Sequence, residues 1–113
     1  MIPHTRLNAY RIMWLFVLFD LPTNTKKERK NASQFRKRLL KDGFTMMQYS
    51  VYVRHCASRQ STQVHIKRIK SMLLTAGKVS IVQITDKQYG LIDNYWGKTG
   101  KPIEKPPNQL EMF

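Results

Sequence analysis

The sequence predicts an α+β fold, specifically a ferredoxin-like βαββαβ sandwich in which two helices cover one face of an antiparallel sheet. Apolar segments of strand length alternate with segments of helical periodicity, and glycine or proline residues separate them. The 113 residues, of which 42% are hydrophobic and 11% aromatic, suit a single packed core. Right-handed crossovers would place both helices on the same side of the sheet.

A continuous apolar run over residues 12–19, rich in aromatic side chains, predicts a central strand that is covered on both faces. Pro22 ends this strand, and the Thr-Asn-Thr sequence after it supplies N-cap candidates for a helix over residues 26–42. Apolar residues recur within the helix at helical spacing, and Gly43 is expected to end it.

The residues after Gly43 predict a second strand and a second helix. Over residues 44–54 the side chains of each face recur at every second position, which is typical of one half-buried strand. Ser58 and Ser61 are cap candidates for the helix that follows, and this helix is expected to end at Gly77.

Residues 78–85 predict a third strand, although its alternation is imperfect. A turn follows, and residues 91–96 are expected to form a fourth, short strand. Beyond it, three prolines and one glycine occur without periodicity, as in a linker. We therefore predict a domain over residues 1–97 and a C-terminal arm over residues 98–113.

A sheet with helices on one face leaves its other face without a cover, which predicts a homodimer formed through the sheet faces. The chain ends in a short alternating segment, residues 109–113, which we expect to add a strand to a neighbouring chain. A free tail is the alternative. The expected partner or dimer contacts in this segment are Gln109, Leu110, Met112 and Phe113.

The chain is strongly basic, because 20 Lys and Arg residues stand against 7 Asp and Glu residues and give a formal net charge of +13. Such a field attracts nucleic acid or an anionic membrane surface. Cations crowd the first predicted helix against a single acid, Glu28, and like charges at this density destabilise a helix unless a polyanion neutralises them. A solvated helix face is the alternative. The predicted nucleic-acid-binding residues, which we expect to contact the backbone without reading sequence, are Lys26, Lys27, Arg29, Lys30, Arg36, Lys37, Arg38, Lys41 and Arg54.

The cellular compartment is indicated by what the sequence lacks. Cys56 is the single cysteine, so no disulfide forms within the chain, and a reducing compartment fits. The apolar run over residues 12–19 is far shorter than the roughly 20 residues of a bilayer span. The N-terminus has no signal-peptide pattern. We therefore expect a cytoplasmic protein with no membrane partner.

Asp20 is an acid at the tip of an apolar strand, in a chain whose residues 29–85 contain only one other carboxylate, Asp42. Mg²⁺ prefers oxygen ligands and keeps most of its water, so one or two carboxylates suffice to hold it against phosphate oxygens. A two-fold axis would supply a second copy of Asp20. The alternative is that Asp20 only caps the turn before Pro22.

Several short motifs occur in an order and at distances that resemble the small CRISPR-associated protein Cas2. The likeness covers about residues 12–96, and the end of the chain is similar to family tails as well. The motifs are Phe-Val-Leu-Phe-Asp-Leu-Pro at 16–22, Lys-Asp-Gly-Phe at 41–44, Gln-Tyr-Ser-Val-Tyr at 48–52, Gly-Lys-Val at 77–79 and Ile-Thr-Asp-Lys-Gln-Tyr at 84–89.

The resemblance implies a ferredoxin-like homodimer that acts in CRISPR adaptation. In that role the dimer bridges two dimers of the Cas1 integrase and holds double-stranded prespacer DNA for insertion into the repeat array. Some members are described as Mg²⁺-dependent endonucleases on single-stranded RNA or double-stranded DNA. The position that matches their metal ligand and catalytic acid is Asp20, and Ser50 and Tyr52 match sheet positions near that site. Met46 stands where such members often carry an arginine, a departure that bears more on cleavage than on binding.

Two classes of function follow, and the architectural one is favoured. In the first, basic helices track the phosphates of DNA and the tail or sheet edge docks a partner. In the second, Mg²⁺ at paired Asp20 residues activates water for attack on a phosphodiester of RNA or DNA. A basic RNA-binding module without catalysis is a third reading, which rests on charge alone.

Overall fold

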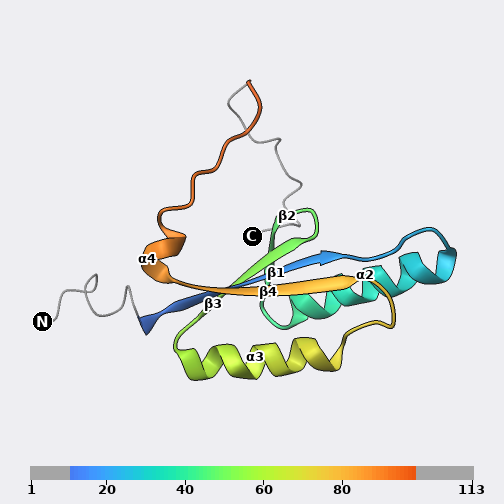
Figure 1. The fold of residues 1–113 in the computed structure, drawn as a ribbon, viewed down its shortest axis with the longest axis horizontal. Coiled ribbons are helices and arrows are strands. Elements are labelled where there is room, and N and C mark those ends of the chain that lie inside the picture. The colour runs from blue at the N-terminus through green and yellow to red at the C-terminus, as the bar shows by residue number, and fades with distance from the viewer. Residues whose placement is uncertain (1–10, 99–113) are drawn as a thin grey trace, which may run out of the picture.

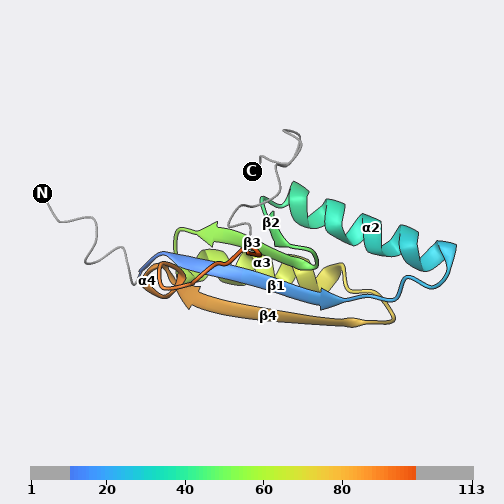
Figure 2. The ribbon, with the colours of Figure 1, turned by 90° about the horizontal axis from the view of Figure 1, so that it is seen from above.

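The computed structural model describes residues 11–98 as a four-stranded antiparallel sheet with helices packed against it (Figure 1). The strands lie in the order β2-β3-β1-β4, so β1 is central, as the view from above also shows (Figure 2). Along the chain the elements are β1 (Met13–Asp20), α2 (Lys26–Lys41), β2 (Thr45–Gln48), β3 (Val51–Cys56), α3 (Arg59–Ser71), β4 (Lys78–Thr85) and the short α4 (Asp86–Tyr89).

Both long helices begin at residues that the sequence marks as caps. Thr25 is the N-cap of α2, and its hydroxyl accepts a hydrogen bond from the Glu28 backbone while the Glu28 carboxylate accepts one from the Thr25 backbone. Ser58 caps α3 with its hydroxyl, which accepts a hydrogen bond from the Ser61 backbone amide. The start of α2 is confirmed, and its end is confirmed to within one residue, because Asp42 is the C-cap.

The core lies between the sheet and the two long helices. Because side chains alternate along a strand, the odd-numbered residues of β1 all face this layer. They pack against buried residues of α2 and α3 and against Phe44. The main members of the core are Met13, Leu15, Val17, Phe19, Phe35, Leu39, Tyr52, Cys56, Ile69 and Met72.

The opposite face of the sheet, which we call the open face, carries the even-numbered residues of β1. Among residues 11–98, α4 covers one end of this face: the rings of Tyr89 and Trp14 stack with centroids 3.7 Å apart, and Trp14 Nε1 donates to Asp86 at 2.6 Å. Leu18 and Val82 remain 38% and 44% exposed. Within one chain, the prediction that β1 is covered on both faces therefore fails at its Asp20 end, where Leu18 and Asp20 are exposed.

The predicted strand over residues 44–54 is two strands. Gln48 pairs with Val51, so Tyr49 and Ser50 form a tight hairpin turn, and an irregularity in the pairing falls between Met46 and Gln48. Ser50, the second residue of the turn, has a φ of 66°, and a positive φ at this position is typical of a type II turn. Uninterrupted alternation hid this turn, because neither turn residue is Gly, Asn or Pro.

The remaining differences lie in the second half of the chain. Helix α3 ends at Ser71, and residues 72–77 form the connection to β4. A short helix, α4, replaces the predicted turn, and residues 91–96 form no strand. The predicted β4 is confirmed at both ends. The arm beyond residue 98, with its expected contacts at 109–113, lies outside the described residues. Among those that are described, no helix is long and apolar enough to cross a membrane.

Candidate functional site

Asp20 lies at the end of β1, on the open face, with its side chain exposed to solvent. Its backbone pairs with Lys78 of β4, and on the other side Phe19 N donates to Ser50 O at 3.1 Å. A shallow cavity of about 320 Å³ opens at this point. Its lining residues come from β1, from the β2–β3 hairpin and from β4, namely Leu18, Phe19, Asp20, Ser50, Val51, Lys78 and Ser80.

The position of Asp20 is fixed by a close backbone approach. Gly77 has a φ of 97°, and a Cβ at that position would lie 2.8 Å from the Asp20 carbonyl oxygen and 2.8 Å from a methyl carbon of Leu21. Only glycine allows the segment before β4 to lie this close to the end of β1. The Asp20 end of β1 and the start of β4 are thereby held together.

Asp20 is available as a metal ligand. Within residues 11–98 its carboxylate forms no hydrogen bond or ion pair. No group of three or more His, Cys, Asp and Glu side chains gathers anywhere in the same part of the chain, so one chain supplies a single carboxylate. Mg²⁺ fits such a donor set when a second copy adds a second carboxylate and water completes the shell.

Of the two other residues expected near Asp20, Ser50 lies beside it and Tyr52 does not. Ser50 lines the cavity beside Asp20. Tyr52 does not, because it pairs with Val17 and its side chain is 3% exposed in the core, on the opposite face of the sheet. Burial raises the pKa of the Tyr52 hydroxyl, and the charge of Arg36 opposes that rise. The structure thus separates Tyr52 from the Asp20 site.

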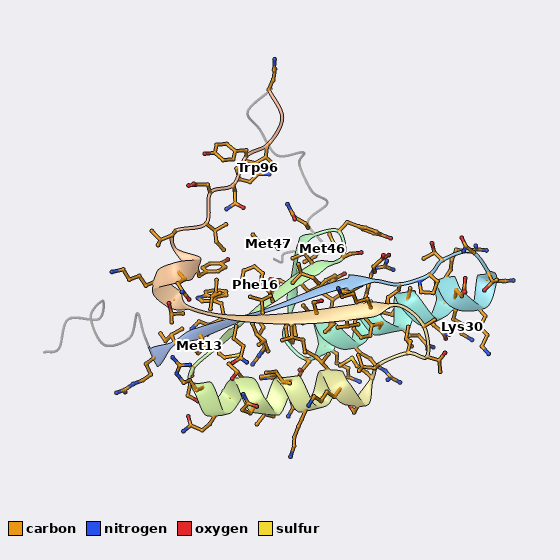
Figure 3. The ribbon with its side chains drawn as sticks, in the orientation of Figure 1. Met13, Phe16, Lys30, Met46, Met47 and Trp96 are labelled. Carbon is orange, nitrogen blue, oxygen red and sulfur yellow. The ribbon has the colours of Figure 1, made fainter. Side chains whose placement is uncertain are left out.

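The cations of α2 are divided among its sides. Lys26, Lys30, Lys37 and Lys41 are all exposed and recur at spacings of a helical ridge, opposite the buried Ala32, Phe35 and Leu39 (Figure 3 labels Lys30). We call these four residues the lysine ridge. It points away from the sheet, on the side of the molecule opposite the open face.

The remaining cations of α2 lie beside other elements. Arg36 donates to the Tyr49 hydroxyl at 2.9 Å, with its guanidinium 4.8 Å from the centre of the Tyr49 ring. Arg29 donates to the Thr23 and Asn24 carbonyls, which leaves it less free for phosphates than the ridge. Lys27 lines a cavity at the start of α2, and Arg38 lines a second one between the ends of α2 and α3.

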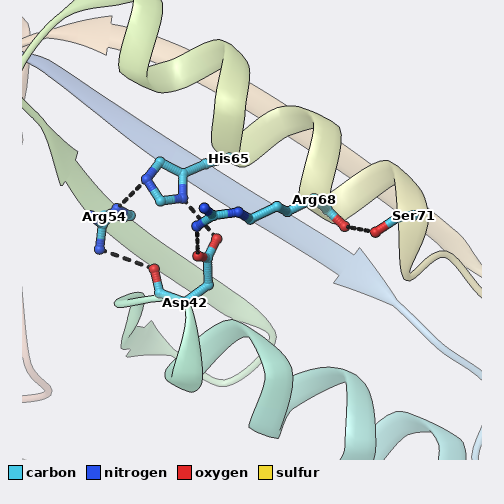
Figure 4. Close-up of polar contacts among 5 residues, drawn as sticks. All are labelled: Asp42, Arg54, His65, Arg68 and Ser71. Carbon is cyan, nitrogen blue, oxygen red and sulfur yellow. Dashed lines mark hydrogen bonds and ion pairs between the residues drawn. The ribbon is translucent and has the colours of Figure 1, made fainter.

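Arg54, expected on nucleic acid, belongs to an internal polar network (Figure 4). Its Nε donates to His65 Nε2 at 2.9 Å and its Nη1 to the Asp42 carbonyl at 3.0 Å. Since Nε2 accepts this bond, the neutral His65 ring carries its proton on Nδ1 and donates it to Asp42 Oδ2 at 2.7 Å. Arg68 donates to the other Asp42 oxygen at 2.6 Å. The network ties the end of α2 to β3 and α3.

Asp42 is the centre of this network. Burial acts to raise the pKa of its carboxyl, but the hydrogen bonds from His65 and Arg68 and the positive charge of Arg68 outweigh it and hold the pKa below its ordinary value. The sequence contained a signal for this role, because Asp42 is the second isolated acid in a basic stretch. Lys78 carried no such signal, since its position opposite Asp20 depends on the pairing of β1 with β4.

Known proteins resemble this chain over most of its length. Residues 13–92 match the model of the family described as CRISPR associated protein Cas2. The chain is 54% identical over 110 residues to the "CRISPR-associated endoribonuclease Cas2" of Flavobacterium psychrophilum, covering 97% of this chain and 96% of that protein. It is 52% identical to the protein of the same name from Parvibaculum lavamentivorans, covering 89% of this chain and 100% of that one.

A solved crystal structure of a Cas2 protein has a similar fold. The TM-score is 0.55 at 21% sequence identity, and the match covers 84% of this chain and 98% of that chain. At this level of identity the likeness concerns the fold alone.

Proposed function

Because the chain belongs to the CRISPR associated protein Cas2 family, we propose that it acts on nucleic acid as a homodimer with a Mg²⁺-dependent phosphodiesterase site at paired Asp20 residues. The observation that carries this proposal is the unpartnered, exposed carboxylate of Asp20 at the rim of the open face. The names of the relatives, which describe endoribonucleases, support a nuclease-type activity on RNA.

The open face supports the homodimer. Along it, Phe16 and Val53 are buried while Leu18 and Val82 are exposed, so an apolar strip runs from the α4 end toward Asp20. Apolar area of this kind gains free energy when a second copy covers it. The βαββαβ element order and the strand order β2-β3-β1-β4 support the ferredoxin-like assignment, for which pairing through sheet faces was expected.

The residues of the site have distinct roles in this proposal. Paired Asp20 carboxylates would hold Mg²⁺, which polarises a phosphodiester and lowers the pKa of bound water when present. Gly77 fixes the backbone of Asp20, and the Ser50 hydroxyl lies in the same cavity, where it can donate a hydrogen bond to a phosphate oxygen. The surrounding apolar strip excludes water from the rest of the interface.

A second role, the bridging of Cas1 dimers around prespacer DNA, is favoured by the lysine ridge. The ridge lies on the opposite side of the molecule from Asp20, so a duplex bound along it does not have to reach the Asp20 site. Phosphates neutralised there would release counterions and make affinity depend on salt. A dimer would present two such ridges, which suits a clamp on the backbone of a duplex.

Asp20→Ala separates the two roles. With full-length protein, labelled single-stranded RNA and duplex DNA, we expect the substitution to abolish Mg²⁺-dependent cleavage and to leave nucleic-acid binding in EDTA unchanged. The matched control is Asp93→Ala, which removes an exposed carboxylate distant in sequence from the site. Cleavage by Asp20→Ala at the rate of the unmodified protein would overturn the catalytic proposal.

The double substitution Lys30→Gln with Lys37→Gln tests the ridge. Binding of duplex DNA should weaken, and its dependence on log salt should become shallower by about 0.9 for each lysine that contacts a phosphate. Spacer acquisition in cells that survives Asp20→Ala but is lost with the ridge variant would assign the bridging role. An unchanged salt slope would remove the ridge from the nucleic-acid contact.

A further inference from the structure

We propose that Lys78, assisted by the Ser80 hydroxyl, is the phosphate-binding half of the Asp20 site. The inference rests on the proposed function, because it places a nucleic-acid phosphodiester at Asp20. It adds a cation to a site whose other polar side chains are the Asp20 carboxylate and the hydroxyls of Ser50 and Ser80. It also supplies the positive charge that an arginine at position 46 would bring. Met46 packs against the core instead (Figure 3 labels Met46).

The pairing of β1 with β4 places Lys78 directly opposite Asp20. Side chains of directly opposed residues project from the same face of an antiparallel sheet, with Cβ atoms roughly 5 Å apart. Two residues further along β4, Ser80 pairs with Leu18 and therefore projects from this face as well. All of these residues line the cavity of about 320 Å³ beside Asp20.

Lys78 does not form an ion pair with Asp20. None of the ion pairs found within residues 11–98 involves Lys78. The Lys78 side chain is exposed and forms no hydrogen bond with any described residue. The carboxylate and the ammonium therefore face one cavity as separate groups. That separation suits a ligand that presents a metal ion to one group and a phosphate oxygen to the other.

The position of Lys78 is fixed by its neighbour in the chain. Gly77 adopts the left-handed conformation immediately before β4 and packs against the Asp20 backbone. Lys78 therefore enters the strand at a place that the end of β1 defines, rather than at the end of a free loop. A lysine held in this way remains beside the metal ligand with or without nucleic acid.

The positive charge of Lys78 should affect the binding of Mg²⁺ and of a phosphodiester in opposite ways. A cation whose Cβ lies roughly 5 Å from that of the metal ligand opposes binding of Mg²⁺ alone, whereas it favours binding of a phosphodiester. Removal of the charge should therefore change the affinities for the two ligands in opposite directions. A lysine with a purely structural role would change neither affinity by itself.

The test is Lys78→Gln in the full-length protein, with Lys67→Gln on the outer side of α3 as the matched loss of one exposed charge. Calorimetry with MgCl2 alone should show a dissociation constant that falls about fivefold for Lys78→Gln. Binding of a short labelled single-stranded RNA in EDTA should weaken by a similar factor. Lys78→Arg should restore the RNA affinity, and Lys67→Gln should leave the Mg²⁺ affinity unchanged.

The outcomes distinguish this inference from the proposed function. If Asp20→Ala abolishes Mg²⁺ binding while Lys78→Gln behaves like Lys67→Gln in both measurements, the metal site stands and the role of Lys78 is refuted. If Asp20→Ala leaves Mg²⁺ binding unchanged, the metal site itself fails. Opposite changes in the two affinities, found only for Lys78→Gln, would support the inference.

Discussion

At the scale of single residues, the most consequential contact outside the Asp20 site is the one that Asp42 forms with His65 and Arg68. A carboxylate held by two donors adds stability because its pKa is lower in the folded chain than in the unfolded chain. That contribution is fully present above the unfolded pKa of about 3.9 and is lost as the pH falls through the lower folded pKa.

We therefore expect Asp42→Asn to lower the free energy of unfolding by about 1–3 kcal/mol at neutral pH, because two charge-assisted hydrogen bonds weaken. The difference from the unmodified protein should shrink as the pH falls below about 4. Urea unfolding at a series of pH values measures this. Asp93→Asn, which removes an exposed acid, should show no difference at any pH. A loss that is constant with pH would contradict the role of the charge.

The same residues show why Arg54 was misjudged from the sequence. A basic residue near the end of a strand in a chain with +13 net charge looks like a phosphate contact. Its actual partners, His65 and the Asp42 carbonyl, come from two other elements. Only the packing of α3 against β3 brings them together, and no local pattern encodes that packing.

At the scale of elements, Gly77 and Gly90 make a matched pair. Gly77 has a positive φ and no room for a Cβ, whereas Gly90 has a φ of −66° and its nearest neighbours would lie 3.5 Å from an added Cβ. We expect Gly77→Ala to lower the free energy of unfolding by about 1–3 kcal/mol. Gly90→Ala should change it by less than about 0.5 kcal/mol or raise it slightly.

Chemical denaturation measures both variants, and Mg²⁺ binding provides a second measurement. Because Gly77 packs against the Asp20 backbone, Gly77→Ala should also weaken Mg²⁺ binding, while Gly90→Ala should not. Equal stability of the two variants would mean that the approach of β4 to β1 is not under strain.

The elements differed in how far the sequence could predict them. β1, α2 and β4 were predicted within one or two residues, because each depends on local signals such as Pro22, Thr25 and an unbroken apolar pattern. The β2–β3 hairpin was missed, since Tyr49-Ser50 contains none of the Gly, Asn or Asp residues that mark two-residue hairpin turns, although Ser50 adopts a left-handed conformation. Residues 91–96 were predicted to form a strand, yet they pair with no described strand.

Part of the candidate site could also be predicted from local sequence signals. Asp20 and Ser50 belong to segments with clear local patterns, and both line the cavity. Tyr52 was misplaced because only the family resemblance put it near Asp20, whereas its pairing with Val17 puts it on the core face of the sheet. Lys78 required the register between β1 and β4, which strands distant in sequence do not reveal.

At the scale of the whole molecule, the open face should decide the oligomeric state. Val82 on this face and Val64 on the outer side of α3 are similarly exposed, at 44% and 47%. We expect Val82→Lys to weaken dimerisation on the order of 100-fold, because a charge would be buried against its own symmetry copy. Val64→Lys should leave the dimer intact.

Sedimentation velocity over a concentration series distinguishes the two variants. Val82→Lys should also lose Mg²⁺ affinity, because a monomer offers one Asp20 carboxylate instead of two. A dimer that survives Val82→Lys would place the interface elsewhere. A monomeric protein that binds Mg²⁺ as tightly as the dimer would separate the metal site from dimerisation.

The alternation of β1 has a consequence for how the length of this strand can change. Its odd-numbered residues fill the core, and its even-numbered residues end at Asp20 on the other side. Inserting one residue before Leu18 would turn the Leu18 and Asp20 side chains toward the helix layer. The Phe19 side chain would turn to the open face. Insertions or deletions of two residues preserve both sides. Lengthening of β1 is therefore tolerated only in even steps, and the acid at its tip constrains the strand as strictly as the core does.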